Sequence, residues 1–210
     1  YSDSAMVVPH SHTYAKGFCS SCGAGCDHSG DDHSHKASYF QQAVCSVCGA
    51  SYGELVQDKR TPDITAEGDL PVMDYADAQN VTYDRYINGS VTIRFTLSDD
   101  SYTQEGFDPA KHSVKLYYWL TDKAVDVGGD WTFKDAFKDG YFSPVTDDQL
   151  TFTPPENSDG ETRIIYLFAE DARGNRRYVT TNGFTIDLSK PEISLVSPVA
   201  EALEEGKTYD

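Results

Sequence analysis

The cysteines of this chain are confined to one short segment near its start. All five lie between Cys19 and Cys48, and the 162 residues that follow contain none. Five of the six histidines also precede Lys36. A disulfide framework usually distributes an even number of cysteines over the domain that it stabilises. Five cysteines within 30 residues, close to most of the histidines, instead indicate a metal-binding segment.

The same segment contains an internal repeat. The Cys-Ser-Ser-Cys-Gly turn at residues 19–23 recurs as Cys-Ser-Val-Cys-Gly at residues 45–49, and the His-Ser-His at residues 10–12 recurs at residues 33–35. A Cys-x-x-Cys turn supplies two zinc ligands, and the glycine after it lets backbone N–H groups face the sulfurs. The repeat predicts one small unit used twice. A disulfide in each pair, or free thiols, is the alternative; disulfide pairing leaves one cysteine over.

Each cysteine pair follows a short element with two further potential ligands. Two complete four-ligand sets result, and we expect each to hold one structural zinc ion with no open position for water. The sets are His10, His12, Cys19 and Cys22, followed by Cys26, His28, Cys45 and Cys48. Two alternatives stay open: the four paired cysteines share one ion, or His33 and His35 replace Cys26 and His28.

Residues from about 60 to 190 alternate apolar and polar side chains in short runs, which is typical of strands. Runs at residues 91–97, 114–120 and 165–169 show this alternation, and Asn88-Gly89 predicts a tight hairpin turn before the first of them. Residues 171–175 predict another turn, and residues 130–137 predict a single helical turn. Several short strands separated by turns predict an all-β sandwich.

The composition divides the chain into three parts. Residues 1–58 form the metal-binding unit, which has too few aliphatic residues to fold without metal. Residues 59–190 form the sandwich, and residues 191–210 are a linker or the start of a further module. Residues 5–9 are too short for the apolar part of a signal peptide, and we expect the chain to be a fragment of a longer protein.

The formal net charge of −17 makes nucleic acid an unfavourable partner because like charges repel. No apolar run approaches the roughly 18 residues that a membrane-spanning helix needs, so membrane insertion is not expected. The acidic surface is instead typical of a soluble, non-aggregating protein; weak capture of divalent cations by surface carboxylates is the alternative.

Catalytic signatures are missing from the sequence, and we expect no enzyme activity. His112 is the single histidine outside the first part, and neither a Gly-x-Ser-x-Gly motif nor a phosphate-binding glycine loop is present. The paired acids Asp99-Asp100 and Asp147-Asp148 are expected in solvated turns rather than in calcium or acid–base sites. Tyr117, Trp119 and Trp131 are expected to pack in the sandwich; a sugar-stacking platform is the alternative.

Two family resemblances follow from these motifs. The order His12-Thr-Tyr, residues 19–23, then Cys26-Asp-His28 resembles the tandem Cys-x-His…Cys-x-x-Cys-Gly zinc-knuckle repeats of Gram-positive surface proteins, although His10 stands where a cysteine is commoner. Residues 113–191, with Leu116-Tyr-Tyr-Trp-Leu and the Asp171-Ala-Arg-Gly-Asn turn, resemble bacterial Ig-like domains.

The resemblances imply an immunoglobulin-like β-sandwich with a small N-terminal zinc-knuckle (zinc-ribbon-like) unit. They also imply a non-catalytic stalk, spacer or adhesin module at the cell surface or in the cell wall. Its expected partners are neighbouring Ig-like modules of the same polypeptide, with a host glycan or protein as a further one. A carbohydrate-binding module and an ancillary domain of a secreted enzyme are the alternative functions.

Overall fold

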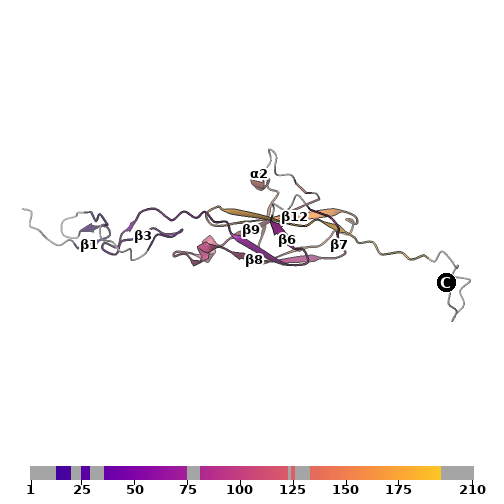
Figure 1. The fold of residues 1–210 in the computed structure, drawn as a ribbon, viewed down its shortest axis with the longest axis horizontal. Helices are drawn as coiled ribbons and strands as arrows, with labels where there is room; N and C mark the ends of the chain where they lie inside the picture. Colours follow the sequence, from indigo (N-terminus) through magenta and orange to yellow (C-terminus); the bar gives the residue numbers. More distant parts are fainter. Residues whose placement is uncertain are drawn as a thin grey trace, which may run out of the picture.

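The computed structural model describes residues 13–19, 25–28, 36–74, 81–122, 124–125 and 133–194. The chain is mostly β, as the alternating pattern predicted, and its main part is a β-sandwich of two facing sheets (Figure 1). The larger sheet contains β10 (Ser143–Val145), β9 (Lys115–Thr121), β12 (Thr162–Glu170), β13 (Arg176–Thr181), β6 (Val72–Asp74), β14 (Phe184–Ile186) and β7 (Arg85–Ile87). The smaller sheet contains β11 (Gln149–Phe152), β8 (Val91–Ser98) and β5 (Asp63–Gly68).

Antiparallel pairing dominates both sheets. β12 pairs with β9 on one side and with β13 on the other, and its first residues also pair with β14. β14 in turn pairs in parallel with β7. The helices are short: η2 (Asp100–Thr103), α1 (Pro109–His112) and α2 (Phe133–Lys138). Over the described segments, no helix has both the length and the apolar character to cross a membrane.

The main core lies between the two sheets. On β8, Val91, Ile93 and Phe95 are buried while Arg94 and Thr96 are exposed, which confirms the predicted alternation. Opposite them, alternate residues of β12 fill the same core. These β12 residues are Ile165, Leu167 and Ala169.

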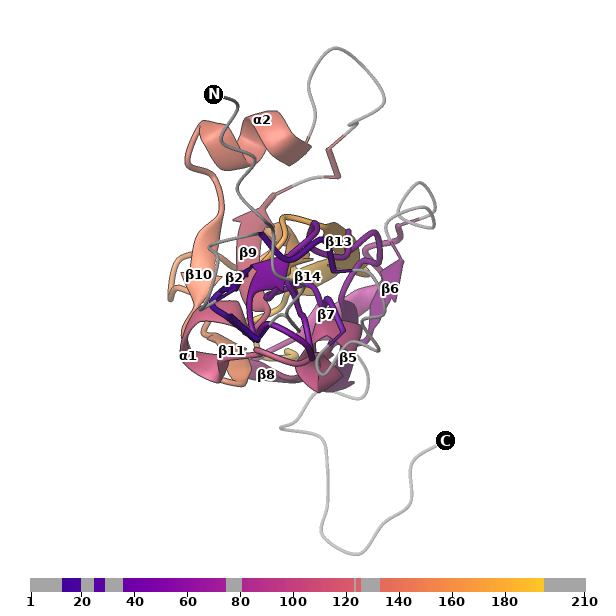
Figure 2. The ribbon, with the colours of Figure 1, turned by 90° about the vertical axis from the view of Figure 1, so that its left-hand side faces the viewer.

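A second core lies on the outer face of the larger sheet, and the sequence pattern did not predict it. The other alternate residues of β12, Ile164, Tyr166 and Phe168, are also fully buried. α2 stands outside the two sheets (Figure 2) and contributes Phe133 and Ala136 to this core. A strand buried on both faces needs apolar residues at every position, and residues 164–169 meet that requirement.

The predicted hairpin at Asn88-Gly89 is wrong. These residues do connect β7 to β8, but β7 pairs with β14 and belongs to the other sheet. Gly89 also lacks the positive φ angle that a tight hairpin turn would need. The turn therefore carries the chain from one sheet to the other.

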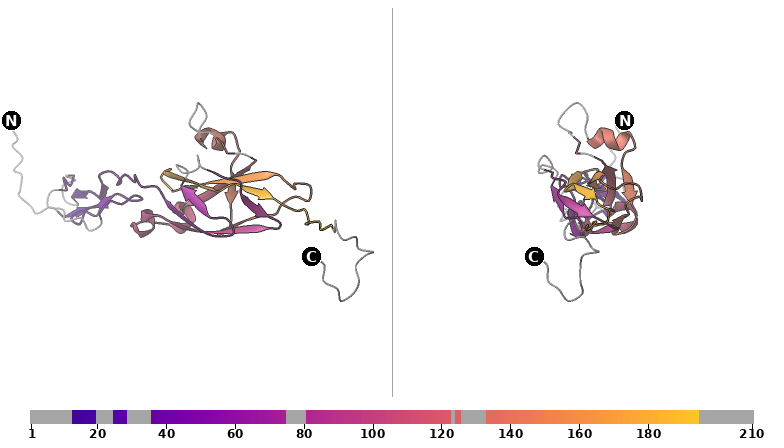
Figure 3. Two further views of the ribbon diagram at one scale, coloured as in Figure 1. Left: turned by 45° about the vertical axis from the view of Figure 1, so that its right-hand side comes forward. Right: turned by 90° about the vertical axis from the view of Figure 1, so that its right-hand side faces the viewer.

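A small N-terminal unit lies at one end of the long axis of the molecule. It contains the hairpins β1 (Tyr14–Ala15) with β2 (Phe18–Cys19), and β3 (Ala43–Val44) with β4 (Ser51–Tyr52). Residues 53–62 connect β4 to β5 without regular secondary structure. After β14 the described chain leaves the sandwich at the opposite end (Figures 1 and 3).

We expect Phe168→Ala to lower the free energy of unfolding by about 3–5 kcal/mol, because it removes a fully buried ring from the second core and leaves a cavity. Urea unfolding followed by circular dichroism measures the change. Tyr86→Ala is the matched control, because this ring is 66% exposed and its removal should change stability by no more than about 0.5 kcal/mol. Equal effects of the two substitutions would contradict a packed core under α2.

Candidate metal centre

The β3–β4 hairpin holds a tight cysteine turn. The backbone N–H of Cys45 donates to the carbonyl of Ala50 at 2.9 Å, and the N–H of Gly49 donates to the carbonyl of Cys45 at 2.8 Å. Gly49 has a φ angle of +67°, a left-handed conformation that glycine adopts without strain. Cys45 and Cys48 are both buried as a result, with their side chains held by one closed turn.

A second short segment carries two further metal-ligating residues. The N–H of Cys26 donates to the carbonyl of Gly17 at 2.8 Å, which fixes the segment beside the β1–β2 hairpin. His28 has a φ angle of +60°, and its ring stacks on Tyr52 of β4 with centroids 4.1 Å apart and planes 4° apart. The stack orients the imidazole toward the cysteine turn.

These two segments bring four ligand atoms together. The side-chain ligand atoms of Cys26, His28, Cys45 and Cys48 all lie within 4.8 Å of one another. The Cys48 Sγ to His28 Nδ1 distance is 3.8 Å. Two ligands of one tetrahedral zinc ion are about 3.6 Å apart, given Zn–S and Zn–N bonds of about 2.3 and 2.0 Å. The cluster can therefore hold a metal ion.

The three thiols influence one another. The pKa of the Cys26 thiol is lowered by a hydrogen bond from the backbone N–H of His28, but burial and the neighbouring Cys48 and Cys45 raise it to about 11. Burial also raises the pKa of Cys48, but the N–H groups of Ala50 and Gly17 and the adjacent thiols bring it below its ordinary value. Backbone N–H groups that point at the sulfurs stabilise thiolates, which are the form that binds metal.

The internal repeat is also present in the backbone. Phe18 and Gly25, which flank the first Cys-x-x-Cys motif in the sequence, form an isolated antiparallel bridge, and Val44 pairs with Ser51 on either side of the second motif. Each residue of the first pair lies 26 positions before its counterpart, the same offset that separates the two Cys-x-x-Cys motifs. A backbone bridge therefore occurs at equivalent positions on either side of each Cys-x-x-Cys motif.

The structure brings together the second of the two predicted ligand sets. Cys19 belongs to β2, but its side chain is not among the described parts of the structure. The other predicted ligands lie outside the described residues, both those of the first set and the two alternatives. These are His10, His12, Cys22, His33 and His35.

His112, the single histidine outside the first part of the chain, is the last residue of helix α1. Its Nδ1 accepts a hydrogen bond from the backbone N–H of Asp108 at 3.0 Å, and its ring stacks on Phe40 with centroids 4.0 Å apart. These contacts assign it a structural role where the N-terminal unit meets the sandwich.

A second group of potential ligands was missed at the level of sequence. Carboxylate oxygens of Asp58, Asp99 and Asp171 lie within 4.8 Å of one another. The three residues are far apart in the chain, so no sequence motif identifies them as a group. Burial raises the pKa of the Asp58 carboxyl, and the Asp171, Asp100 and Asp99 carboxylates raise it further against a lowering hydrogen bond from the Arg60 N–H. Asp99 and Asp100 were expected to be solvated in a turn. This prediction is wrong, because both residues are half-buried.

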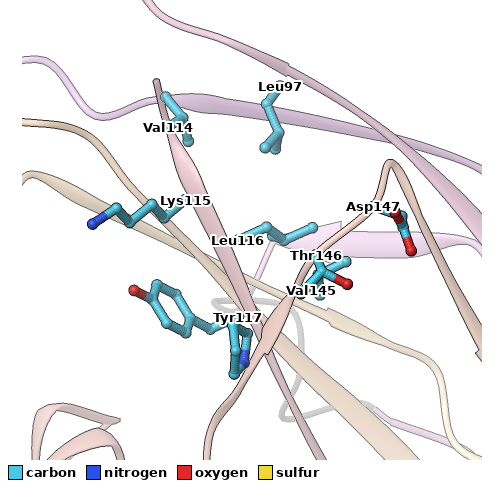
Figure 4. A pocket seen from close by; sticks show the side chains of 9 residues that line it. Leu97, Val114, Lys115, Leu116, Tyr117, Val145, Thr146 and Asp147 are labelled. Carbon is cyan, nitrogen blue, oxygen red and sulfur yellow. The ribbon is translucent and has the colours of Figure 1, made fainter. Parts of the chain in front are cut away.

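A pocket of about 280 Å³ lies between the two sheets, where β9 and β10 approach the end of β8 (Figure 4). Leu97, Leu116 and Val145 give it an apolar lining. Lys115 and Asp147, the charged residues of this lining, point in different directions. Catalytic and ligand sites usually have polar groups that converge on one point, and these do not.

No protein-family model matches this chain, and no curated protein shows significant sequence similarity to it.

We expect Cys48→Ser to lower the number of retained zinc ions by one, because it removes one of four ligands from a closed cluster. Native mass spectrometry of the zinc-loaded chain counts the ions directly. Val47→Ser is the matched control in the same turn, since Val47 is 47% exposed and should leave the count unchanged. Equal counts for the wild type and Cys48→Ser would show that the cluster holds no ion.

Proposed function

We propose that this chain is a non-catalytic spacer or adhesion module of a multi-domain bacterial surface protein, with structural zinc in its N-terminal unit. The observation that carries the proposal is the path of the chain. The N-terminal unit lies at one end of the long axis, and the described chain leaves at the other end after β14 (Figure 3). A module with this path adds its length to whatever precedes and follows it.

The junction between the two parts supports a rigid spacer. Ser38 Oγ donates to the carbonyl of Glu105 at 2.6 Å, and Tyr39 Oη donates to Asp100 Oδ2 at 2.8 Å. The Phe40 ring stacks on His112, and the Arg173 guanidinium lies 5.5 Å from the Phe40 centroid on its face. Hydrogen bonds and stacked rings across one interface restrict the relative motion of the two units.

Zinc is the metal that best fits the cysteine cluster. Three thiolates and one imidazole are soft and borderline ligands, and four protein ligands complete a tetrahedron with no open position. The unit also needs such an ion, because its apolar core is small. Its buried apolar residues, among those described before Asp58, are Tyr39, Ala43, Cys45 and Cys48. The backbone bridge at equivalent positions of the two repeats supports a second zinc ion at the first Cys-x-x-Cys motif.

We assign the sandwich to the immunoglobulin-like class on its two facing, largely antiparallel sheets and on the Asp-Ala-Arg-Gly-Asn turn between β12 and β13. This assignment implies an extracellular location at the cell surface or in the cell wall, and neighbouring Ig-like modules as partners. The closed metal cluster agrees with a structural rather than a chemical role.

Rotational motion tests the spacer. We expect the N-terminal unit and the sandwich to share one rotational correlation time in backbone ¹⁵N relaxation, because Ser38, Tyr39 and Phe40 fix them together. Phe40→Ala removes the ring stacked on His112 and should give the N-terminal unit a shorter correlation time than the sandwich. Phe18→Ala is the control, since this ring is 62% exposed. Two correlation times in the wild type would contradict a rigid spacer.

A carbohydrate-binding module, alone or as an ancillary domain of a secreted enzyme, is the second candidate. Tyr141 is 52% exposed, and its ring lies 5.2 Å from that of Trp119 with a tilt of 39°. The tilt and the position of Trp119 against the second core weaken a flat stacking platform. Trp131, the other predicted platform residue, lies outside the described residues.

A glycan array separates the two candidates. We expect no specific binding by the wild-type chain, because the Trp119 and Tyr141 rings are not coplanar. Micromolar binding that Tyr141→Ala abolishes while the fold survives would replace the spacer with a carbohydrate-binding module. Tyr86→Ala, on a tyrosine of β7 that is 66% exposed, is the matched control for nonspecific loss.

A further inference from the structure

Three carboxylates meet where the N-terminal unit joins the sandwich. Asp58 belongs to the segment between β4 and β5, Asp99 follows β8, and Asp171 opens the turn between β12 and β13. Their ligand oxygens lie within 4.8 Å of one another. Two oxygens on opposite sides of one Ca²⁺ ion are separated by about 4.6–5.2 Å, so this spacing suits a single ion.

Backbone groups hold the three carboxylates in place. Asp58 Oδ1 accepts from the N–H of Arg60 at 3.0 Å, and Asp99 Oδ1 accepts from the N–H of Ser101 at 2.9 Å. Asp171 Oδ1 accepts from the N–H groups of Arg173 and Asn175, and its Oδ2 accepts from the Asn175 side-chain amide. Each side chain is fixed by its own turn, and none of these donors is a cation.

Several oxygens at this point are buried, and no donor among the described residues forms a hydrogen bond with them. Asp58 is only 8% exposed, and in the described part of the chain neither its Oδ2 nor Asp99 Oδ2 has a partner. Ser101, the residue whose N–H holds Asp99, is 1% exposed, and its Oγ likewise has no partner among these residues. Burying an oxygen without a hydrogen-bond partner costs free energy, and burying a carboxylate in this way costs more.

Positive side chains near the cluster are used elsewhere. Arg60 pairs with Asp100 at 3.4 Å, and Arg173 lies over the ring of Phe40. Among the described residues, no lysine, arginine or histidine forms an ion pair with the three clustered carboxylates. Two of the three carboxylates belong to buried residues, and negative charges at this distance repel one another; a cation between them would remove that repulsion.

The geometry points to a Ca²⁺ site formed by Asp58, Asp99 and Asp171. Carboxylate oxygens are hard ligands and suit Ca²⁺ or Mg²⁺ rather than the soft metals that thiolates select. Ca²⁺ tolerates irregular coordination by oxygens from separate segments, whereas Mg²⁺ requires a near-ideal octahedron. The ion joins the segment that leaves the N-terminal unit to two turns of the sandwich, and it is separate from the cysteine cluster.

Calorimetric titration of the full, zinc-loaded chain with CaCl₂ tests the site. The wild type should bind one Ca²⁺ with a dissociation constant of about 10⁻⁶ to 10⁻³ M, and the Tm should rise with calcium concentration. Asp58→Asn and Asp99→Asn should each weaken binding at least about tenfold, since each removes a charged ligand. Asp147→Asn is the matched control, because it removes the same charge from an exposed turn.

Without calcium, Asp58→Asn should have a Tm equal to or above that of the wild type, because it removes a negative charge from a buried cluster. The proposal fails if the wild type shows no saturable calcium binding up to 10 mM, a concentration about tenfold above the weakest expected dissociation constant. It also fails if Asp147→Asn weakens binding as much as Asp58→Asn does. Tighter binding of Mg²⁺ than of Ca²⁺ would overturn the assignment to calcium.

Discussion

The burial of β12 on both faces is the constraint on which most of the structure depends. One set of its alternate side chains fills the core between the sheets, and the other set fills the core under α2. The strand pairs with β9 and β13 along most of its length, so its backbone groups are also satisfied. Its last residue leads directly into the turn at Asp171, so the same strand positions the end of the sandwich that faces the N-terminal unit.

Local patterns predicted the parts of this structure that depend on local chemistry. The alternation of residues 91–97 predicted which face of β8 is buried, and the Cys-x-x-Cys-Gly motif predicted a tight ligand-bearing turn. The outer core was not predictable in this way, because Tyr166 and Phe168 are covered by residues 133–142. Alternation along a strand does not show which distant segment covers its outer face. The partner of β7 was missed for the same reason: Asn88-Gly89 describes the turn, whereas pairing depends on which distant strand is available.

The two candidate metal sites show the same limit. Cys45 and Cys48 are three residues apart, and this spacing of two thiols identifies them in the sequence as potential metal ligands. Asp58, Asp99 and Asp171 come from three separate segments, and aspartate is common in exposed turns, so only the folded chain distinguishes this group from other acidic residues. The two sites also differ in what they would stabilise. The thiol cluster compensates for a small apolar core within one unit, whereas the carboxylate cluster lies where two units meet.

The end-to-end path of the chain has a consequence for mechanical force. Tension along the long axis enters the sandwich at Asp63, the first residue of β5, and leaves it at Ile186, the last residue of β14. These strands belong to different sheets; β5 is the first strand of the sandwich along the chain, and β14 is the last. β14 pairs in parallel with β7, so a pull on its C-terminal end loads the hydrogen bonds of that pair together, in shear, instead of opening them one after another. This pairing therefore predicts resistance to stretching along the long axis.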